Sequence, residues 1–198
     1  MVSFYINGEP VEVQLEGEKT AGDVLRSFEM TCEENSAAVI GIRIDGRQVT
    51  AETFDAEAET PLGAGTKFEF TVVTEGSVHE SFANLATLFN ELADQMENVP
   101  AAIQNGKNAE VLSSIKQLAD SISQFCHLAA LASLFPDKFS ETKIDGKDFR
   151  EFFDGFSPVL LDFEQALKDN DTVMIGDLSE YEICPRLHSI SRALSEIE

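Results

Sequence analysis

Basic residues are scarce in this sequence. There are 14 Lys and Arg against 36 Asp and Glu, which gives a formal net charge of −22 at pH 7. The imbalance extends over the whole chain, with 5 basic and 15 acidic side chains in residues 1–76 and 9 and 21 in residues 77–198. Proteins bind nucleic acids and anionic membranes largely through Lys and Arg. The composition therefore argues against both kinds of partner. Solubility and the prevention of self-association explain the charge most simply, and an acidic face that meets a basic protein partner is the alternative.

Cysteine and long apolar runs are also scarce. Cys32, Cys126 and Cys184 are an odd number without a CxxC pair, as expected for reduced cysteines in a cytoplasmic protein. The longest stretch without a charged side chain, residues 121–136, has 16 residues, which is too short for a transmembrane helix. The first ten residues show no basic leader followed by an apolar run, so no secretion signal is predicted. We expect a cytoplasmic protein without a membrane span.

The motifs of common catalytic and metal sites are missing. No GxGxxG, Walker loop, GxSxG or HExxH occurs. Asp169–Asn170–Asp171 begins like an EF-hand loop, but Val173 and Met174 stand where a further ligand and a glycine are needed, so helix capping is the expected role. None of the three histidines has a Glu three residues before it, which excludes the di-iron pattern of helical bundles. We predict no catalytic residue, no metal and no cofactor.

Residues 1–75 are predicted to form a small domain with a sheet. Asn7–Gly8 between two alternating runs indicates a hairpin whose second strand extends to Leu15. Thr20 can cap a helix from Ala21 to about Cys32. The other predicted elements are strands at Val39–Ile44, around Gln48–Thr50 and at Lys67–Val73, with an irregular segment at Phe54–Pro61.

The order of these elements resembles the ubiquitin-like β-grasp over residues 2–74. Four local patterns are similar to those of the sulfur carriers of thiamin and molybdopterin synthesis, namely Asn7–Gly8–Glu9, Thr20–Leu25, Ile44–Asp45–Gly46 and Leu62–Phe68. The resemblance implies the fold but not the carrier chemistry, because a carrier needs a free C-terminal Gly-Gly and Gly76 is single and internal. We expect Gly76 to be a hinge and the β-grasp to serve as a recognition module.

Residues 77–198 are predicted to form an antiparallel four-helix bundle. The apolar stripes of the four helices run from Phe82 to Met96, Val111 to Phe135, Phe149 to Leu167 and Val173 to Ile197. Ser77 and Glu80 have the spacing of a capping box at the start of the first helix, and Pro100 is expected to end it. Pro158 and Pro185 should kink or restart the third and fourth helices. The predicted fold class is thus α+β, with a β-grasp at 1–75 and a bundle at 77–198.

The second of these stripes is the widest. Val111–Phe135 carries apolar residues around most of its circumference, and no charged side chain occurs between Asp120 and Asp137. Burial of apolar surface is the main favourable term in folding. We therefore expect the other three helices to cover this helix on all sides.

Polar side chains gather in the last segment, DTVMIGDLSEYEICPRL. Asp177, Glu180 and Tyr181 share one helix face, and Cys184 and His188 are four residues apart. These five residues are the candidate interaction cluster, an acidic pocket for a cationic side chain. The alternative is a solvated face with a buried tyrosine hydroxyl bonded to a carboxylate. Cys184 and His188 could also hold zinc or form an activated thiolate, although no second pair completes such a site.

The helical segment resembles only uncharacterised bacterial proteins, so the resemblance brings no activity with it. The sequence as a whole predicts a non-catalytic protein–protein interaction module, an adaptor or a chaperone-like protein, whose acidic surface binds a basic or amphipathic protein. An enzyme or small-ligand-binding protein that uses an inter-domain cleft is the alternative, and homodimerisation is a third. Neither a nucleic acid nor a membrane is expected as a partner.

Overall fold

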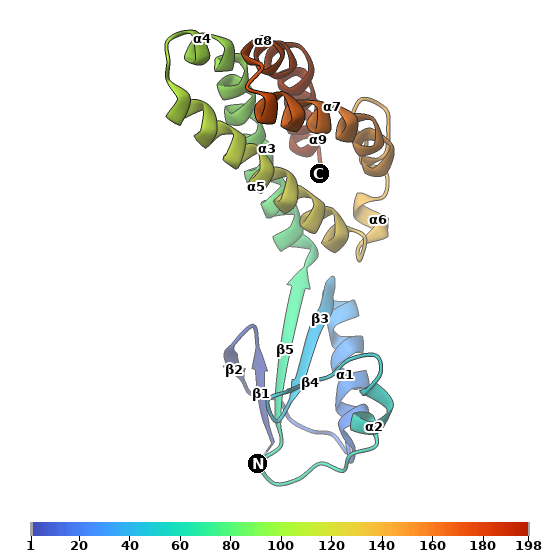
Figure 1. Ribbon diagram of the computed structural model, residues 1–198. Helices are drawn as coiled ribbons and strands as arrows, with labels where there is room; N and C mark the ends of the chain where they lie inside the picture. The colour runs from blue at the N-terminus through green and yellow to red at the C-terminus, as the bar shows by residue number, and fades with distance from the viewer. Residues whose placement is uncertain (1, 198) are drawn as a thin grey trace. The chain divides into compact units, whose positions relative to one another are not determined.

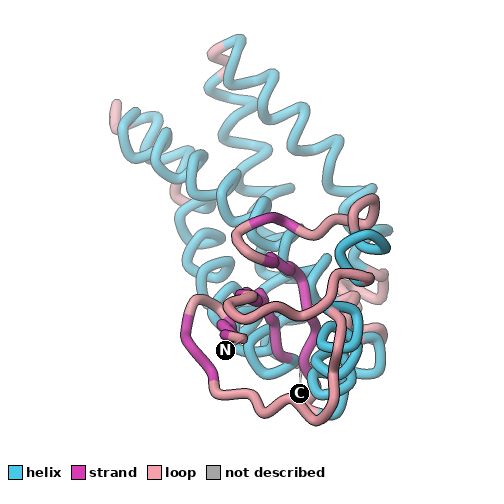
Figure 2. The backbone as a smooth tube through the Cα atoms, turned by 90° about the horizontal axis from the view of Figure 1, so that it is seen from below, coloured by secondary structure: helices cyan, strands magenta, loops and turns pink. Residues whose placement is uncertain are grey.

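The computed structural model describes residues 2–197, and the chain divides into two compact units after Ser77. The first unit contains a mixed five-stranded sheet, and the second is helical (Figure 1). Figure 2 colours the elements by type, and the strands in it belong to the first unit. The fold class is therefore α+β.

The sheet has the strand order β2-β1-β5-β3-β4. The strands are β1 Ser3–Ile6, β2 Glu9–Val11, β3 Ala37–Ile44, β4 Arg47–Gln48 and β5 Lys67–Thr74. β1 and β5 run parallel, and the other neighbouring pairs are antiparallel. The two hairpins turn at Asn7–Gly8 and Asp45–Gly46, where all four residues have positive φ. Both turns are confirmed, since Asn, Asp and Gly tolerate this conformation better than other residues.

The core of the first unit lies between the sheet and helix α1 (Ala21–Glu34). Its buried members are Phe4, Ala21, Val24, Leu25, Ile44, Phe68 and Phe70. The predicted cap of α1 is present, because the Asp23 amide donates to Thr20 Oγ1 at 3.2 Å and the Thr20 amide donates to Asp23 Oδ2 at 3.1 Å. Sequence pattern and capping thus locate this helix correctly.

Two predictions for the first unit are wrong. Strand β2 ends at Val11 rather than Leu15, because β1 begins at Ser3 and the last paired residues are Phe4 and Val11. The segment predicted to be irregular contains helix α2 (Phe54–Ala58). A five-residue helix is too short to show a 3.6-residue periodicity, so its sequence pattern carries little signal.

The second unit contains more helical elements than the four that were predicted. They are α3 Glu75–Glu97, α4 Val99–Gln104, α5 Asn108–Ala132, α6 Pro136–Phe139, α7 Phe149–Asp169, α8 Thr172–Asp177, the π-helix η1 Leu178–Ile183 and α9 Cys184–Ser195. The four predicted stripes lie on α3, α5, α7 and the run α8–η1–α9. The expected capping role at the calcium-like sequence is confirmed, since Asp171 Oδ1 accepts from the Met174 amide at 3.0 Å. Among residues 2–197, no helix combines the length and the apolar character that a membrane span requires.

The predicted capping box at the start of α3 is wrong. The helix begins at Glu75, directly after strand β5, so Ser77 lies inside its first turn. Thr74 supplies the cap instead. The Ser77 amide donates to Thr74 Oγ1 and the Thr74 amide donates to Ser77 Oγ, both at 3.1 Å. Gly76, the predicted hinge, lies in this first helical turn.

The prolines interrupt the helices less than predicted. Pro100 does not merely end a helix but lies in the first turn of α4, where a missing N–H costs nothing. Pro158 lies inside α7, which continues through it. Pro185 lies in the first turn of α9, and the chain just before it widens into the π-helix η1. The predicted disturbance at Pro185 is thus a local widening, with the Cys184 amide bonded to the Ser179 carbonyl five residues earlier.

Helix α5 is not covered on all sides. One stripe is buried, consisting of Val111, Ser114, Leu118, Ser121, Phe125, Leu128 and Ala132. The Phe125 ring lies at 5.0 Å from the rings of Phe149 and Phe153, measured between centroids. However, Leu112, Ala119 and Cys126 on the adjacent stripe are exposed. The expectation of complete cover is wrong for the single chain, because an absence of charge does not by itself imply burial.

Candidate functional site

The predicted cluster lies where α8, η1 and α9 follow one another. Asp177 is the last residue of α8, Glu180 and Tyr181 belong to η1, and Cys184 and His188 belong to α9. Asp177 and Tyr181 are exposed, Glu180 and His188 are half-buried, and Cys184 is buried. The structure therefore divides the five residues into two groups. The surface group is Asp177, Glu180 and Tyr181, and the second group is the buried thiol of Cys184 with His188 on the same helix.

The surface group is a tyrosine beside two carboxylates. A hydrogen bond with the Glu180 carboxylate raises the pKa of Tyr181 above its usual value, and the charges of Glu180 and Asp177 act in the same direction. The phenol is therefore protonated at neutral pH and lies near the Glu180 carboxylate. Because Tyr181 is 65 % exposed, its hydroxyl is not buried, whereas the solvated face of that alternative agrees with the structure. The arrangement presents carboxylates and an aromatic ring to solvent, a combination that suits a cationic side chain.

The thiol of Cys184 lies among groups that disfavour its ionisation. Burial raises its pKa, and the carboxylates of Glu97, Asp94 and Glu180 raise it further. A reactive cysteine needs neighbouring positive charge that favours the thiolate. These influences disfavour the thiolate form that an activated cysteine would need. Within the described residues, no group of three or more His, Cys, Asp and Glu side chains is arranged to hold a metal ion.

The π-helix determines how this surface is presented. Pro185 has no N–H to donate to the Tyr181 carbonyl, so the regular α-helical ladder cannot continue through η1. Arg186 Nη1 compensates by donating to the Glu182 carbonyl at 2.8 Å and to its carboxylate at 2.6 Å. The Arg186 guanidinium also lies 5.8 Å from the centre of the Phe156 ring. Arg186 thus stabilises the widened turn that carries Glu180 and Tyr181.

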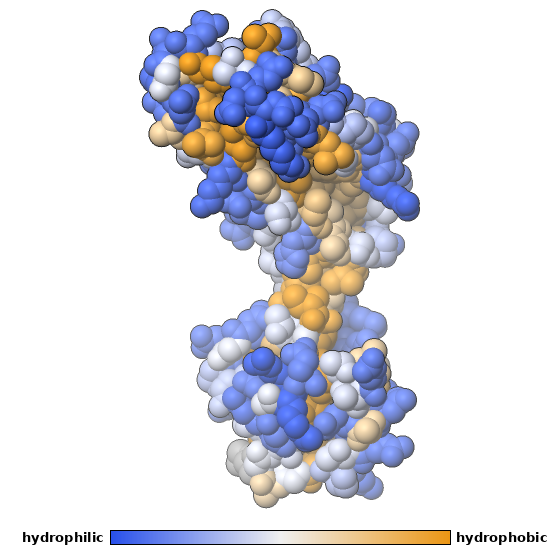
Figure 3. All heavy atoms as spheres, viewed as in Figure 1, coloured by the Kyte–Doolittle hydropathy of each residue, from blue (hydrophilic) through white to orange (hydrophobic). Residues whose placement is uncertain are grey.

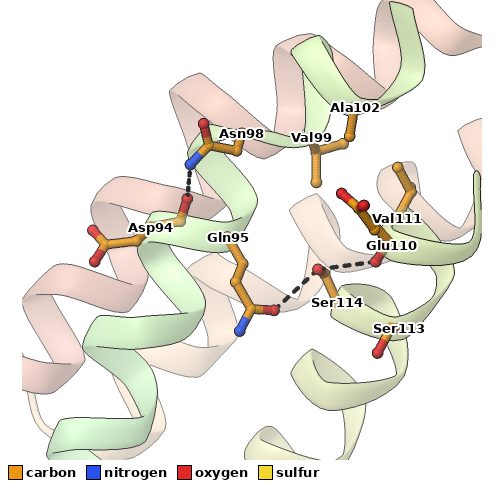
Figure 4. A pocket seen from close by; sticks show the side chains of 9 residues that line it. All are labelled: Asp94, Gln95, Asn98, Val99, Ala102, Glu110, Val111, Ser113 and Ser114. Atoms are coloured by element: carbon orange, nitrogen blue, oxygen red, sulfur yellow. Dashed lines mark hydrogen bonds between the residues drawn. The ribbon is translucent and has the colours of Figure 1, made fainter. Parts of the chain in front are cut away.

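A second polar site lies between α3, α4 and α5 (Figure 4). It is a cavity of about 410 Å³, lined by Asp94, Gln95, Asn98, Val99, Ala102, Glu110, Val111, Ser113 and Ser114. Ser114 Oγ donates to Gln95 Oε1 at 3.0 Å and also lies 3.2 Å from the Glu110 carbonyl. In Figure 4 the Glu110 carboxylate points toward Val99, and the Asp94 carboxylate points away from the Gln95–Ser114 pair.

Asp94 connects the two sites. It lines the cavity, and its charge also acts on the Cys184 thiol. Carboxylates from α3 and from α8–η1 therefore belong to one acidic region at this end of the helical unit, which we call the acidic end and define as Asp94, Glu97, Asp177 and Glu180. The contribution of α3 could not be predicted from the sequence, because the residues are about 80 positions apart.

The cavity is not predicted either, because the sequence pattern indicates no helix between the stripes that end at Met96 and begin at Val111, where α4 lies. Two signals were available. Pro100 is favourable in the first turn of a helix, and Gly106, with φ of 69°, is the type of residue that follows a helix end. Together they delimit a short helix between α3 and α5.

The fold and the two polar sites define an α+β protein with a sheet unit followed by a helical unit whose acidic end carries the candidate site. The model of the family described as a domain of unknown function (DUF8042) matches residues 80–193, more than half of the chain, and the chain belongs to this family. A second model, described as the TP0873 N-terminal domain, matches residues 2–74.

The chain is similar to an uncharacterized protein of Treponema pallidum (strain Nichols). The two are 23% identical over 193 residues, which cover 98% of this chain and 96% of the relative. Both units are therefore matched together in one bacterial protein. No solved structure matches the chain.

Proposed function

We propose that the protein is a non-catalytic protein–protein interaction module, an adaptor or chaperone-like protein, that binds a basic or amphipathic protein through its acidic surface. The observation that carries the proposal is the small number of internal ion pairs. Residues 2–197 contain five, although the chain has 36 Asp and Glu. Most carboxylates are thus available to an oppositely charged partner, which would associate rapidly because of long-range attraction.

The acidic end is the part of this surface that we assign to the partner. Asp94 and Glu97 of α3 and Glu180 of η1 all act on the same thiol, and Asp177 and Glu180 act on the same phenol. Carboxylates that act on common neighbours lie close enough to reinforce one another's potential. The exposed ring of Tyr181 adds an apolar contact for the stem of a Lys or Arg side chain.

The proposal includes the fold of each unit and the location of the protein in the cell. The strand order β2-β1-β5-β3-β4, with α1 packed on the sheet, supports a ubiquitin-like β-grasp that serves as a recognition module. The continuation of the chain into α3 speaks against a sulfur carrier, because Gly76 has no free carboxylate. The stripes on α3, α5, α7 and α8–η1–α9 support a four-helix bundle. The cysteine content supports a cytoplasmic location.

The test is a comparison of two variants that change the net charge equally. The first neutralises the acidic end through Asp94→Asn, Glu97→Gln, Asp177→Asn and Glu180→Gln. The control neutralises four exposed residues of the sheet unit through Glu12→Gln, Glu33→Gln, Glu34→Gln and Glu52→Gln. Partners are captured from a bacterial lysate at low salt, identified by mass spectrometry and retested as purified proteins.

We expect a partner that binds the wild type and the control variant but not the acidic-end variant, and that dissociates as salt is raised. Equal binding by both variants would show that charge at this end is not used. Detection of a catalytic turnover that the acidic-end variant abolishes would show that the protein is an enzyme.

A second candidate is binding of a small cation in the cavity between α3, α4 and α5. Its volume of about 410 Å³ and its lining of Asp94, Glu110, Gln95 and two serines favour this function. Spermidine is a suitable probe in a thermal unfolding assay. The candidate requires a higher melting temperature with spermidine that Asp94→Asn combined with Glu110→Gln removes, and an unchanged melting temperature would exclude it.

A further inference from the structure

Helix α5 has a second apolar stripe beside the buried one. Its members, spaced alternately three and four residues apart, are Leu112, Ile115, Ala119, Ile122, Cys126 and Ala129. Leu112, Ala119 and Cys126 are exposed, and the two isoleucines and Ala129 are half-buried. We call these six residues the open seam. In Figure 3, apolar residues are visible along the course of α5. This spacing is that of a helix that packs against another helix.

The open seam is also free of net charge in a very acidic protein. Between residues 111 and 136 the charged side chains are Lys116 and Asp120, which cancel, whereas the whole chain carries −22. The charge of the remaining surface opposes the approach of a second copy, and the open seam does not add to this repulsion. A basic partner would find no excess of carboxylates between residues 111 and 136, so the acidic surface and the open seam suit different partners.

The open seam is complementary to itself. When two copies of α5 run antiparallel about a two-fold axis with Ala119 opposite Ile122, Ile115 faces Cys126 and Leu112 faces Ala129. Each large side chain then meets a small one, and the symmetry repeats every contact. The seam spans 17 residue steps, or about 26 Å at the helical rise. This is long enough for several layers of knobs-into-holes packing.

We propose that a second copy of this chain covers the open seam, with the two α5 helices packed antiparallel in a homodimer. Helix α5, which the sequence predicts to be covered on all sides, is thus covered on its exposed side by the partner copy. The proposal concerns a surface other than the acidic end and does not depend on the proposed function.

The test begins with the mass of the protein in solution. Sedimentation velocity is measured at about 1 and about 100 μM protein, in 0.05 and in 0.5 M NaCl. We expect a monomer–dimer equilibrium with more dimer at 0.5 M NaCl, because salt screens the repulsion between two chains of −22. Binding of a basic partner would show the opposite salt dependence. A monomer under all four conditions would overturn the proposal.

Variants then locate the interface. Ala119→Glu places a charge in the centre of the open seam, and Gln124→Glu adds the same charge at an exposed position elsewhere on α5. We expect Ala119→Glu to weaken the dimer at least tenfold and Gln124→Glu to weaken it much less, with the circular dichroism of both unchanged. If Ala119→Glu disturbs folding, Leu112→Glu replaces it, since Leu112 is 64 % exposed. Equal weakening by the seam variant and the control would contradict the proposed interface, even if a dimer exists.

Discussion

Helices α5 and α7 belong to the same unit and differ in what they present to solvent. Both bury a stripe that contains aromatic side chains, and their rings meet where Phe125 contacts Phe149 and Phe153. The exposed positions of α7 carry five acidic residues, Glu151, Asp154, Asp162, Glu164 and Asp169, and two basic ones, Arg150 and Lys168. Those of α5 between residues 111 and 132 carry Lys116 and Asp120. The outer face of α7 is suited to water, whereas that of α5 is suited to contact with another apolar surface.

The largest expected effect is the difference in stability between a variant of the buried stripe of α5 and a variant of the open seam. Phe125 is 1 % exposed and is surrounded by aromatic rings, so Phe125→Ala should lower the free energy of unfolding by about 3–5 kcal/mol. Leu112 is on the open seam. Leu112→Ala should therefore change the free energy of unfolding by less than about 0.5 kcal/mol at a concentration where the protein is monomeric. Urea unfolding measures both values. Similar losses for the two variants would mean that the two stripes are not distinct.

The starts of the two helices differ as well. Asp148 Oδ1 accepts from the Glu151 amide at 2.7 Å and caps α7, whereas Lys107 makes no side-chain cap at the start of α5. Asp148→Ala should therefore cost about 1 kcal/mol of stability. Lys107→Ala should cost less than about 0.5 kcal/mol, because its ion pair with Glu110 is exposed. Thermal or urea unfolding distinguishes the two variants, and an equal cost would contradict the assigned cap.

Two serines of the buried stripe should respond in opposite directions. Ser121 Oγ is buried without a hydrogen-bond partner within residues 2–197, so Ser121→Ala should raise the free energy of unfolding by about 1 kcal/mol. Ser114 Oγ is hydrogen-bonded to Gln95 and to the Glu110 carbonyl. Ser114→Ala should therefore lower the free energy of unfolding by a similar amount. The same unfolding assay compares them. A loss of stability in Ser121→Ala would indicate that the hydroxyl has a partner, such as a buried water.

The local elements with strong residue signals could be predicted from the sequence. The Asn7–Gly8 and Asp45–Gly46 turns depend on two adjacent residues with positive φ, and the Thr20 cap depends on atoms three residues apart. Long amphipathic helices are recognisable for the same reason, because their period repeats within the segment. These features need no knowledge of distant parts of the chain.

The remaining features depend on contacts that the local sequence does not contain. The sequence of η1 predicts a disturbance near Pro185 but not a π-helix, whose geometry also involves the bonds of Arg186 to Glu182. The acidic end could not be predicted, because the sequence does not show that the charges of Asp94 and Glu97 act on the Cys184 thiol. The cover of α5 was overestimated, because the lack of charge indicates a preference for contact and does not say which chain provides it.

The reactivity of Cys126 tests the central claim about α5 most directly. Cys126 is exposed on the open seam, and Cys184 is buried and serves as an internal control whose raised pKa makes it react slowly. Alkylation by iodoacetamide is followed for both residues by mass spectrometry at about 1 and about 100 μM protein in 0.5 M NaCl. We predict that Cys126 reacts quickly in the dilute sample and several-fold more slowly in the concentrated one, while Cys184 reacts slowly in both. A Cys126 rate that is the same at both concentrations would contradict the claim that a second copy covers this helix.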